Sequence, residues 1–381
     1  MDFNLPEELV ILKSNVRRFV DTELIPLEKA LAEDLEGQKR LSTVLAPKVE
    51  ALGLRHFDVP EEFGGLGLGM LAKVVVWSEI ARTTAIPARN LTIFGPNVSP
   101  ILYCLEGEAK DKYLLPVLRG EKATCFAQTE PEAGSDPARM RTSAVRQGEH
   151  YVLNGVKRYI TGAEEADFAQ VFAITDPEKG TRGGISGFLV DMDSPGVRIS
   201  RRESMMIDDR PCELVFDNVR VPAANLIGLE GDGFKNAQQW LNAGRIRHGA
   251  RAIGVIDRCV ELDISYAKQR TTFGKLLAER QAVQWPIIDS YMHLHQLTLM
   301  AHHAAWKYDR GEDVRAEAYM VKIFGDEQSY RAADWCMQIH GGMGLSKEMP
   351  IERFFRDQRS MMITEGPVDV LRMALARLIM H

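Results

Sequence analysis

The sequence predicts an α+β protein that is mostly α and has three parts. These are an N-terminal helical domain, a middle antiparallel β-barrel or sandwich domain, and a C-terminal four-helix bundle. Three observations predict this fold class. Apolar residues recur every three or four positions in the first part, short β-branched and aromatic runs fill the middle, and the helical period returns after Gly233. A chain of 381 residues is also too long for one ordinary core.

Residues 1–119 have the spacing of buried helices, and we expect them to form the N-terminal domain. One apolar stripe comprises Leu5, Leu9, Leu12, Val16, Phe19 and Val20, and Pro26 marks a break soon after it. The glycine-rich loop Pro60–Gly69 separates this stripe from a further helix through Val74–Ile80. Because the loop lacks the Lys-Ser/Thr pair of a phosphate loop and follows no clear strand, it is weak support for a nucleotide site.

Residues 120–228 are expected to form the β-domain. The expected strands are the short runs Tyr151–Leu153, Val156–Ile160, Ala169–Ile174, Phe188–Asp191, Val197–Ile199, Glu213–Phe216 and Val219–Val221. Turn signals separate these runs, among them Asn154-Gly155 and Asp217-Asn218. Strands at this spacing, without intervening helices, favour a small antiparallel barrel or sandwich.

Residues 229–381 return to the helical period and carry few helix breakers. The expected helices span roughly residues 234–270, 280–310, 314–339 and 367–380. Their length and their heavy apolar faces favour a four-helix bundle whose outer faces pack on other subunits.

Composition and charge argue against several classes of protein. The net charge is −6 and the isoelectric point is near 5.9, which disfavours nucleic acid as the main partner. The chain begins with acidic residues where a signal or transit peptide has basic ones, and no apolar run reaches the roughly 18 residues of a membrane span. We therefore expect a cytoplasmic protein with no membrane span.

The cysteines and histidines do not have the spacing of a metal site. The five cysteines are scattered and odd in number, which fits a reducing compartment without a disulfide framework. The histidine pairs His293/His295 and His302/His303 are one or two positions apart, so the members of a pair do not share a helix face. We expect no metal.

One carboxylate, Glu365, lies between an apolar run and the turn residues Gly366 and Pro367. Proline is well placed in the first turn of the helix that follows, so Glu365 is expected on a tight loop. A carboxylate flanked by side chains that exclude water is less stable when charged, and is then a better base near neutral pH. From this stretch alone, the alternative is a capping or surface glutamate.

Five local motifs are spread over nearly the whole chain. They are Pro60–Gly69; Thr129-Glu130-Pro131-Glu132-Ala133-Gly134-Ser135-Asp136; Asn154-Gly155-x-Lys157-x-Tyr159-Ile160-Thr161; Arg270-x-Thr272-Phe273-Gly274 followed by Gln281; and Gln338-Ile339-His340-Gly341-Gly342-x-Gly344, which leads to Arg356-Asp357 and Glu365-Gly366. In this order and with this layout, the chain resembles the acyl-CoA dehydrogenase family of flavoproteins. Some positions depart from the family pattern, notably Glu132 in place of a glycine and Pro367-Val368-Asp369 after the Glu-Gly pair.

The resemblance implies FAD as the cofactor, lying extended between the β-domain and the C-terminal bundle. The residues that it places around the flavin ring are Phe126, Gln128, Thr129, Ser135, Tyr159 and Thr161. Those that it places at the pyrophosphate and adenosine, partly from a neighbouring subunit, are Arg270, Phe273, Gln281, Gln338, Gly341 and Gly342. The chemistry is suitable, because threonine hydroxyls donate to ring atoms without adding charge and an arginine fits a pyrophosphate. Taken singly, these threonines are ordinary strand-end residues and Arg270 is a solvated charge.

The resemblance also implies a mechanism for an acyl-CoA thioester substrate. Glu365 takes the α-proton while N5 of FAD receives the β-hydride, which gives a trans-2-enoyl-CoA. The thioester oxygen accepts from the backbone N–H of Glu365 and from a ribityl hydroxyl of FAD. Some relatives carry the base just before a helix arginine, but here that position is Gly244, so no second carboxylate competes.

The implied substrate contacts are Ser135, Asn242, Arg245 and Gly366. The alternative for Arg245 is a solvated basic helix face shared with Arg247 and Arg251. The implied partner is an electron-transferring flavoprotein, and the implied assembly is a homotetramer built as a dimer of dimers. Two other functions stay open: an oxygen-using oxidase or monooxygenase of the same fold, and a catalytically silent acyl-CoA or flavin binder.

Overall fold

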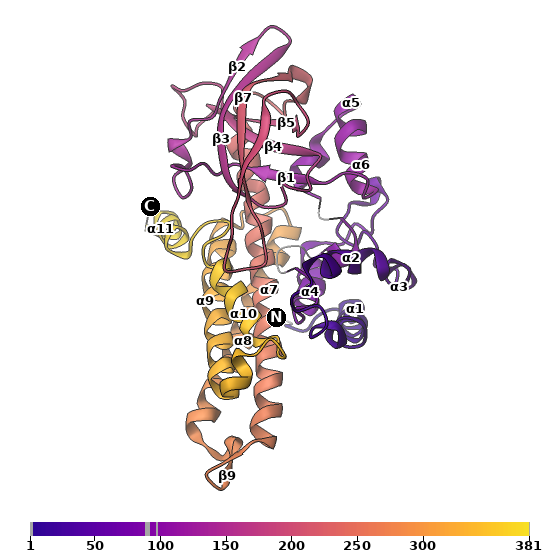
Figure 1. The fold of residues 1–381 in the computed structure, drawn as a ribbon, viewed down its shortest axis with the longest axis vertical. Helices are drawn as coiled ribbons and strands as arrows, with labels where there is room; N and C mark the ends of the chain where they lie inside the picture. Colours follow the sequence, from indigo (N-terminus) through magenta and orange to yellow (C-terminus); the bar gives the residue numbers. More distant parts are fainter. Residues whose placement is uncertain (1–2, 88–91, 97, 381) are drawn as a thin grey trace. The chain divides into compact units, whose positions relative to one another are not determined.

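The computed structural model of the protein describes residues 3–87, 92–96 and 98–380 (Figure 1). The chain divides into two compact units. The first, called the helical unit below, combines Met1–Gly95 with Asn242–His381, and the second, called the β unit, spans Pro96–Leu241. The domain boundaries expected after residues 119 and 228 stay a prediction.

The N-terminal helices of the helical unit follow the predicted apolar pattern. They are α1 (Glu7–Phe19), α2 (Leu35–Val44), α3 (Ala46–Ala51) and α4 (Met70–Ile80). The chain leaves α1 through a π-helical turn, Val20–Leu24, and a 3-10 turn, Ile25–Leu27. The predicted helix Val74–Ile80 lies within α4, where every side chain of that stretch is buried. Further 3-10 turns span Glu61–Phe63 and Thr92–Phe94.

The C-terminal helices are α7 (Gly233–Gln269), α8 (Gln281–Asp309), α9 (Arg315–His340), α10 (Ile351–Met361) and α11 (Val368–Met380). A two-stranded hairpin, β8 (Thr271–Thr272) and β9 (Lys275–Leu276), and a 3-10 turn, Leu277–Glu279, join α7 to α8. Another 3-10 turn, Gly341–Leu345, follows α9. In Figure 1, α8 and α9 run side by side, as their packing requires. The four predicted helices match α7, α8, α9 and α11.

The sequence interpretation missed α10, and the reason is its polar buried face. Arg353, Asp357, Gln358 and Ser360 are all buried on this helix. An apolar stripe is the signal by which a buried helix is recognised, and here polar side chains occupy much of that face.

The β unit has a 3-10 turn, Pro100–Cys104, followed by α5 (Gly107–Ala109) and α6 (Leu115–Leu118), which flank a π-helical turn, Lys110–Leu114. Its strands are β1 (Thr124–Ala127), β2 (Ser143–Gln147), β3 (His150–Ile160), β4 (Phe168–Ile174), β5 (Ile185–Asp191), β6 (Val197–Arg202) and β7 (Cys212–Pro222). They form one curled sheet in the order β1-β4-β2-β3-β7-β6, with β5 beside β4. Most pairs are antiparallel, as predicted, while β4 pairs in parallel with β1 and β2.

Two of the predicted turns are wrong because both strands continue through them. Asn154-Gly155 lies inside β3 and Asp217-Asn218 lies inside β7, and the pairing of β3 with β7 shifts register between Leu153 and Gly155. The Asn218 N–H donates to the Asn154 side-chain oxygen at 2.8 Å. Gly155 and Asn218 both have positive φ, so turn-type residues here form a bulge that bends a long ribbon.

The helical unit has one continuous apolar core. It joins Val16 and Phe19 of α1, Ile80 of α4, Ile253 of α7 and Leu297 of α8. Each of these side chains is removed from water, so the N-terminal and C-terminal helices stabilise one another by burying apolar surface. Among the described residues, no helix combines the length and hydropathy that a membrane span requires.

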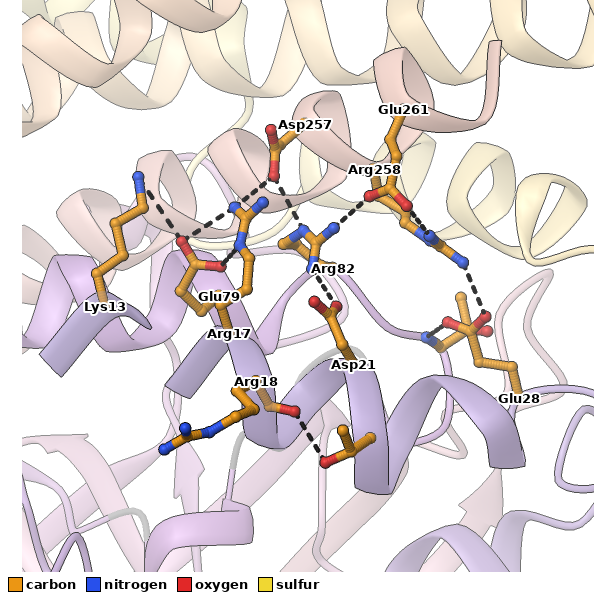
Figure 2. Close-up of polar contacts among 12 residues, drawn as sticks. Lys13, Arg17, Arg18, Asp21, Glu28, Glu79, Arg82, Asp257, Arg258 and Glu261 are labelled. Atoms are coloured by element: carbon orange, nitrogen blue, oxygen red, sulfur yellow. Dashed lines mark hydrogen bonds and ion pairs between the residues drawn. The ribbon is translucent and has the colours of Figure 1, made fainter. Parts of the chain in front are cut away.

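A cluster of ion pairs joins the N-terminal helices to α7 within the helical unit (Figure 2). It comprises Arg17, Asp21, Glu79, Arg82, Asp257, Arg258 and Glu261. Arg82 lies just after α4 and is 2% exposed. Its guanidinium donates to Asp21 at 2.6 Å, to Asp257 at 2.9 Å and to Glu261. Asp257 also accepts from Arg17 at 2.6 Å, so two arginines share one carboxylate.

Candidate active site

Glu365 lies on the short loop between α10 and α11, as the sequence predicts. The loop is held by hydrogen bonds from the Thr364 N–H to Ser360 at 3.2 Å and from the Val368 N–H to Met362 at 3.1 Å. Glu365 has φ +55° and the next residue, Gly366, has φ +104°. A left-handed backbone at a residue other than glycine costs of order 1–3 kcal/mol, and such strain is concentrated at functional sites.

The two carboxylate oxygens of Glu365 have different surroundings. Oε1 lies 3.6 Å from His248 Nε2 and 3.7 Å from Arg247 Nη2, and both residues are on α7. Oε2 has no hydrogen-bond partner among the described residues, although it is buried. The side chain as a whole is 19% exposed. The carboxylate is therefore held through one oxygen, and the other is buried without a hydrogen-bond partner among the described residues.

Gly244 leaves room for this arrangement. A Cβ atom at position 244 would lie 2.1 Å from Glu365 Oε2, a distance that real atoms do not reach without moving. The Glu365 carboxylate thus lies over Gly244, the position that the family resemblance compares with the base of some relatives. The expectation that Glu365 is the single base stays a prediction.

The expectation that burial raises the pKa of Glu365 is wrong. Burial does oppose ionisation, but His248, Arg247 and Lys322 together outweigh it and lower the pKa well below the usual glutamate value. Glu365 is therefore ionised across the neutral range. The sequence singles out none of these three residues as a partner of Glu365.

Arg245 does not belong to a solvated helix face. Arg245 is 5% and Arg251 6% exposed, so that alternative is wrong. The Arg245 guanidinium donates to the Glu365 carbonyl at 3.4 Å and to the Asn242 side chain at 3.0 Å, and it lies over the Tyr319 ring at 4.9 Å. Arg245 thus fixes the loop that carries Glu365 and brings Asn242 toward it.

In the β unit, a buried ion pair connects two of the sequence motifs. Lys157 Nζ donates to Glu130 at 2.8 Å and to the Gln128 carbonyl at 3.0 Å, and Lys157 is fully buried. Burial lowers the pKa of Lys157 to about 8, with Glu130 opposing the shift. The Arg158 N–H donates to the Thr129 carbonyl at 2.8 Å. These bonds place Gln128 and Thr129 beside the end of β3, which carries Tyr159 and is followed by Thr161.

The remaining residues expected around the flavin occupy different environments. Phe126 stacks on Trp240, with ring centroids 4.3 Å apart. Tyr159 is 49% exposed and has φ +59°, so it is a second strained residue at an expected cofactor position. The Thr161 hydroxyl donates to Asp209 at 3.0 Å. Ser135 is exposed on the turn after β1, and no contact joins it to the others within the described part of the chain.

The residues expected at the FAD pyrophosphate and adenosine lie near one end of the C-terminal helices. The Tyr266 ring, near the end of α7, stacks on His340, the last residue of α9, at 4.4 Å. This contact brings together the chain segments that carry Arg270, Phe273, Gln281, Gln338, Gly341 and Gly342, all of which are exposed. Phe273 is 98% exposed at φ +47°.

This surface fits a bulky anionic cofactor. A Cβ atom at Gly341 or Gly342 would meet nothing within 4 Å, so the backbone there is open to a ligand. Arg270 supplies a planar positive group, and an exposed aromatic ring such as Phe273 suits contact with another ring system.

Three acyl-CoA dehydrogenase family profiles match the chain. They describe the N-terminal domain over residues 6–121, the middle domain over 125–219 and the C-terminal domain over 231–380. The chain is 36% identical to an acryloyl-CoA reductase (NADH) of Anaerotignum propionicum, covering 100% of this chain and 96% of the relative. It is 35% identical to an acyl-CoA dehydrogenase of Bacillus subtilis, covering 98% of each.

The fold is similar to solved structures over the same length. The FAD complex of PigA matches with a TM-score of 0.88 at 30% identity, covering 100% of this chain and 99% of that one. The likeness thus extends through all three family domains, and the predicted fold class and cofactor are confirmed. The chain belongs to the acyl-CoA dehydrogenase family and is an FAD-dependent oxidoreductase.

Proposed function

We propose that the protein dehydrogenates an acyl-CoA thioester to the trans-2-enoyl-CoA, with Glu365 as the base. The observation that carries the proposal is the unpartnered Oε2 of Glu365, a buried carboxylate oxygen whose companion is held by two basic side chains. Such an oxygen is suited to accept a proton from a ligand placed against it.

FAD, when bound, supplies the acceptor for the β-hydride. The chain's own residues perform the rest. Glu365 Oε2 removes the α-proton, while Arg245 holds the backbone carbonyl of the same residue. The Glu365 N–H donates to no group among the described residues, so it is available to the thioester oxygen, where negative charge develops. The left-handed φ of Glu365 turns both the N–H and the side chain away from an ordinary helical course.

A neighbouring subunit is proposed to complete each cofactor site. From His248, which faces the base, to Arg270, α7 rises 1.5 Å per residue, which makes about 33 Å. This separation supports an Arg270 that holds the flavin of a neighbouring chain, while the Glu365 of its own chain serves another flavin. We therefore propose at least a dimer, and a homotetramer as the closed assembly of two such dimers. An electron-transferring flavoprotein is the proposed acceptor of the electrons.

Arg270→Ala is expected to yield folded protein depleted in FAD, because the variant loses the charge proposed to pair with the pyrophosphate. FAD content per chain is measured by absorbance after gel filtration. Arg315→Ala is the matched control, since Arg315 is an exposed arginine at the start of another C-terminal helix and forms an ion pair with Asp313. Full flavin occupancy in Arg270→Ala would remove the proposed role.

The proposed function is tested by anaerobic bleaching of the bound flavin with a panel of straight, branched, aromatic and dicarboxylic acyl-CoA thioesters. Rapid bleaching by one class identifies the substrate and confirms dehydrogenation. No bleaching by any thioester, with FAD bound, would overturn it. Oxygen consumption during turnover separates a dehydrogenase from an oxidase or monooxygenase of the same fold.

The reverse reaction is a second candidate. Two observations favour it: the likeness to an acryloyl-CoA reductase, and the lowered pKa of Glu365, which makes its protonated form a better proton donor. The same residue then returns the proton to the α-carbon. Faster oxidation of the reduced protein by 2-enoyl-CoA than bleaching by the matching acyl-CoA would favour reduction.

A further inference from the structure

A row of four charged or ionisable side chains leads from the proposed base into the core of the helical unit. Glu365 Oε1 faces His248 Nε2 at 3.6 Å, and His248 Nδ1 faces Asp326 Oδ1 at 3.2 Å. Asp326 Oδ2 accepts from Lys322 Nζ at 2.8 Å. His248 is 3%, Asp326 1% and Lys322 0% exposed. Groups of this kind are rarely placed in a core unless each has a partner.

His248 lies between two carboxylates. Both ring nitrogens face carboxylate oxygens, which only accept hydrogen bonds. A ring that carries a hydrogen on each nitrogen would donate to Asp326 at 3.2 Å and present a positive charge to Glu365 at 3.6 Å. The charges of Lys322 and Asp326 cancel one another, so a positive charge on the His248 ring would act mainly on Glu365.

The row also connects the loop that carries Glu365 to the helices α7 and α9. Lys322, on α9, donates to the carbonyl of Met361, the last residue of α10, at 3.0 Å. His248 and Gly244 are four residues apart on α7, so they share a face. His248 therefore contacts one carboxylate oxygen while Gly244 leaves space for the other. Arg247 is the further cation near Oε1, at 3.7 Å.

We infer that His248, backed by Asp326 and Lys322, is a positioning residue that keeps Glu365 ionised and directs its free oxygen toward the substrate. The inference rests on the proposed function, in which Glu365 is the base. A carboxylate next to a buried cation stays charged in surroundings that would otherwise favour its neutral form. The protein thus has a desolvated base that is ready before the substrate arrives.

The test is an infrared titration of the ligand-free, FAD-loaded protein. Subtracting the spectra of Glu365→Gln from those of the parent isolates the carbonyl band of protonated Glu365, because only that carboxyl is missing from the variant. For His248→Gln, the spectra of the double variant His248→Gln/Glu365→Gln are subtracted in the same way. His302→Gln is the control, since His302 is a largely desolvated histidine of α8 that forms no ion pair with Glu365 among the described residues.

In the parent and in His302→Gln, the protonated band is expected to be absent from pH 7 down to pH 5. In His248→Gln it is expected to appear with a midpoint at least one pH unit higher than in the parent. The acid limb of the kcat/KM profile for flavin bleaching, which reports the free enzyme, should move by the same amount.

An unchanged midpoint in folded His248→Gln would overturn the inference, even if bleaching became slower at every pH, since a merely structural role lowers the rate without moving the midpoint. If that variant does not fold, the titration of the parent protein is the test. A protonation midpoint of Glu365 at or above its ordinary pKa of 4.5 in the parent overturns the inference. A failure of the proposed function can be told apart from a failure of this inference. The first shows as normal turnover by Glu365→Gln, and the second shows only in the infrared titration.

Discussion

Replacing Glu365 with glutamine is expected to lower the turnover of an acyl-CoA substrate by at least about 100-fold, the usual scale for a lost general base. Glutamine has nearly the same shape, so it fits the space above Gly244, but it cannot take the α-proton at a useful rate. Arg245 contacts the backbone of residue 365 rather than its side chain, so the loop should keep its course. The rate of anaerobic flavin bleaching is the measurement.

Two controls make this result specific to the base. FAD content and thioester affinity should stay within about twofold of the parent, because the residues proposed to hold the cofactor are elsewhere in the chain. The flavin should still be reduced by dithionite, which needs no base. If Glu365→Gln bleached at a rate close to that of the parent, another group would have to be the base.

Replacing Arg82 with methionine is expected to lower the free energy of unfolding by about 3 kcal/mol, at the low end of the roughly 3–5 kcal/mol range for breaking a buried ion pair. Methionine preserves much of the side-chain volume but leaves Asp257 with only Arg17 in the cluster of Figure 2. The low end applies because Asp21 and Glu261 remain 44% and 51% exposed and keep access to water. Urea unfolding followed by circular dichroism gives the change.

Arg315→Met is the matched control for Arg82→Met. Arg315 also forms an ion pair with an aspartate, but both partners are more than half exposed, so the loss should be below about 1 kcal/mol. Equal losses in the two variants would mean that burial does not determine the value of the Arg82 cluster. Because the protein is proposed to be oligomeric, both unfolding curves need the same protein concentration.

Much of this fold follows from local patterns in the sequence. The long helices of the C-terminal part have continuous apolar stripes, so α7, α8 and α9 were predictable to within a few residues. The bulge in the long β-ribbon was not predictable in this way. Asn154-Gly155 and Asp217-Asn218 have the composition of turns, and only their pairing across β3 and β7 makes them a bulge.

Some residues of the candidate site could be predicted from the sequence and others could not. Glu365 is recognisable from its loop and its motif, and the glycine at 244 from its place before Arg245. His248, Lys322 and Asp326 are separated by up to 78 positions and resemble ordinary helix residues until α7 and α9 pack together. The direction of the Glu365 pKa shift depends on those residues, so burial alone predicted the wrong sign.

The left-handed backbone of Glu365 has a consequence for protein engineering. Glycine, and to a lesser degree asparagine, adopts a φ near +55° at lower conformational cost than glutamate. A procedure that selects substitutions only for thermal stability would therefore favour replacing the one side chain that the proposed chemistry requires. Engineering for higher thermal stability should therefore leave residue 365 unchanged and choose substitutions elsewhere in the fold.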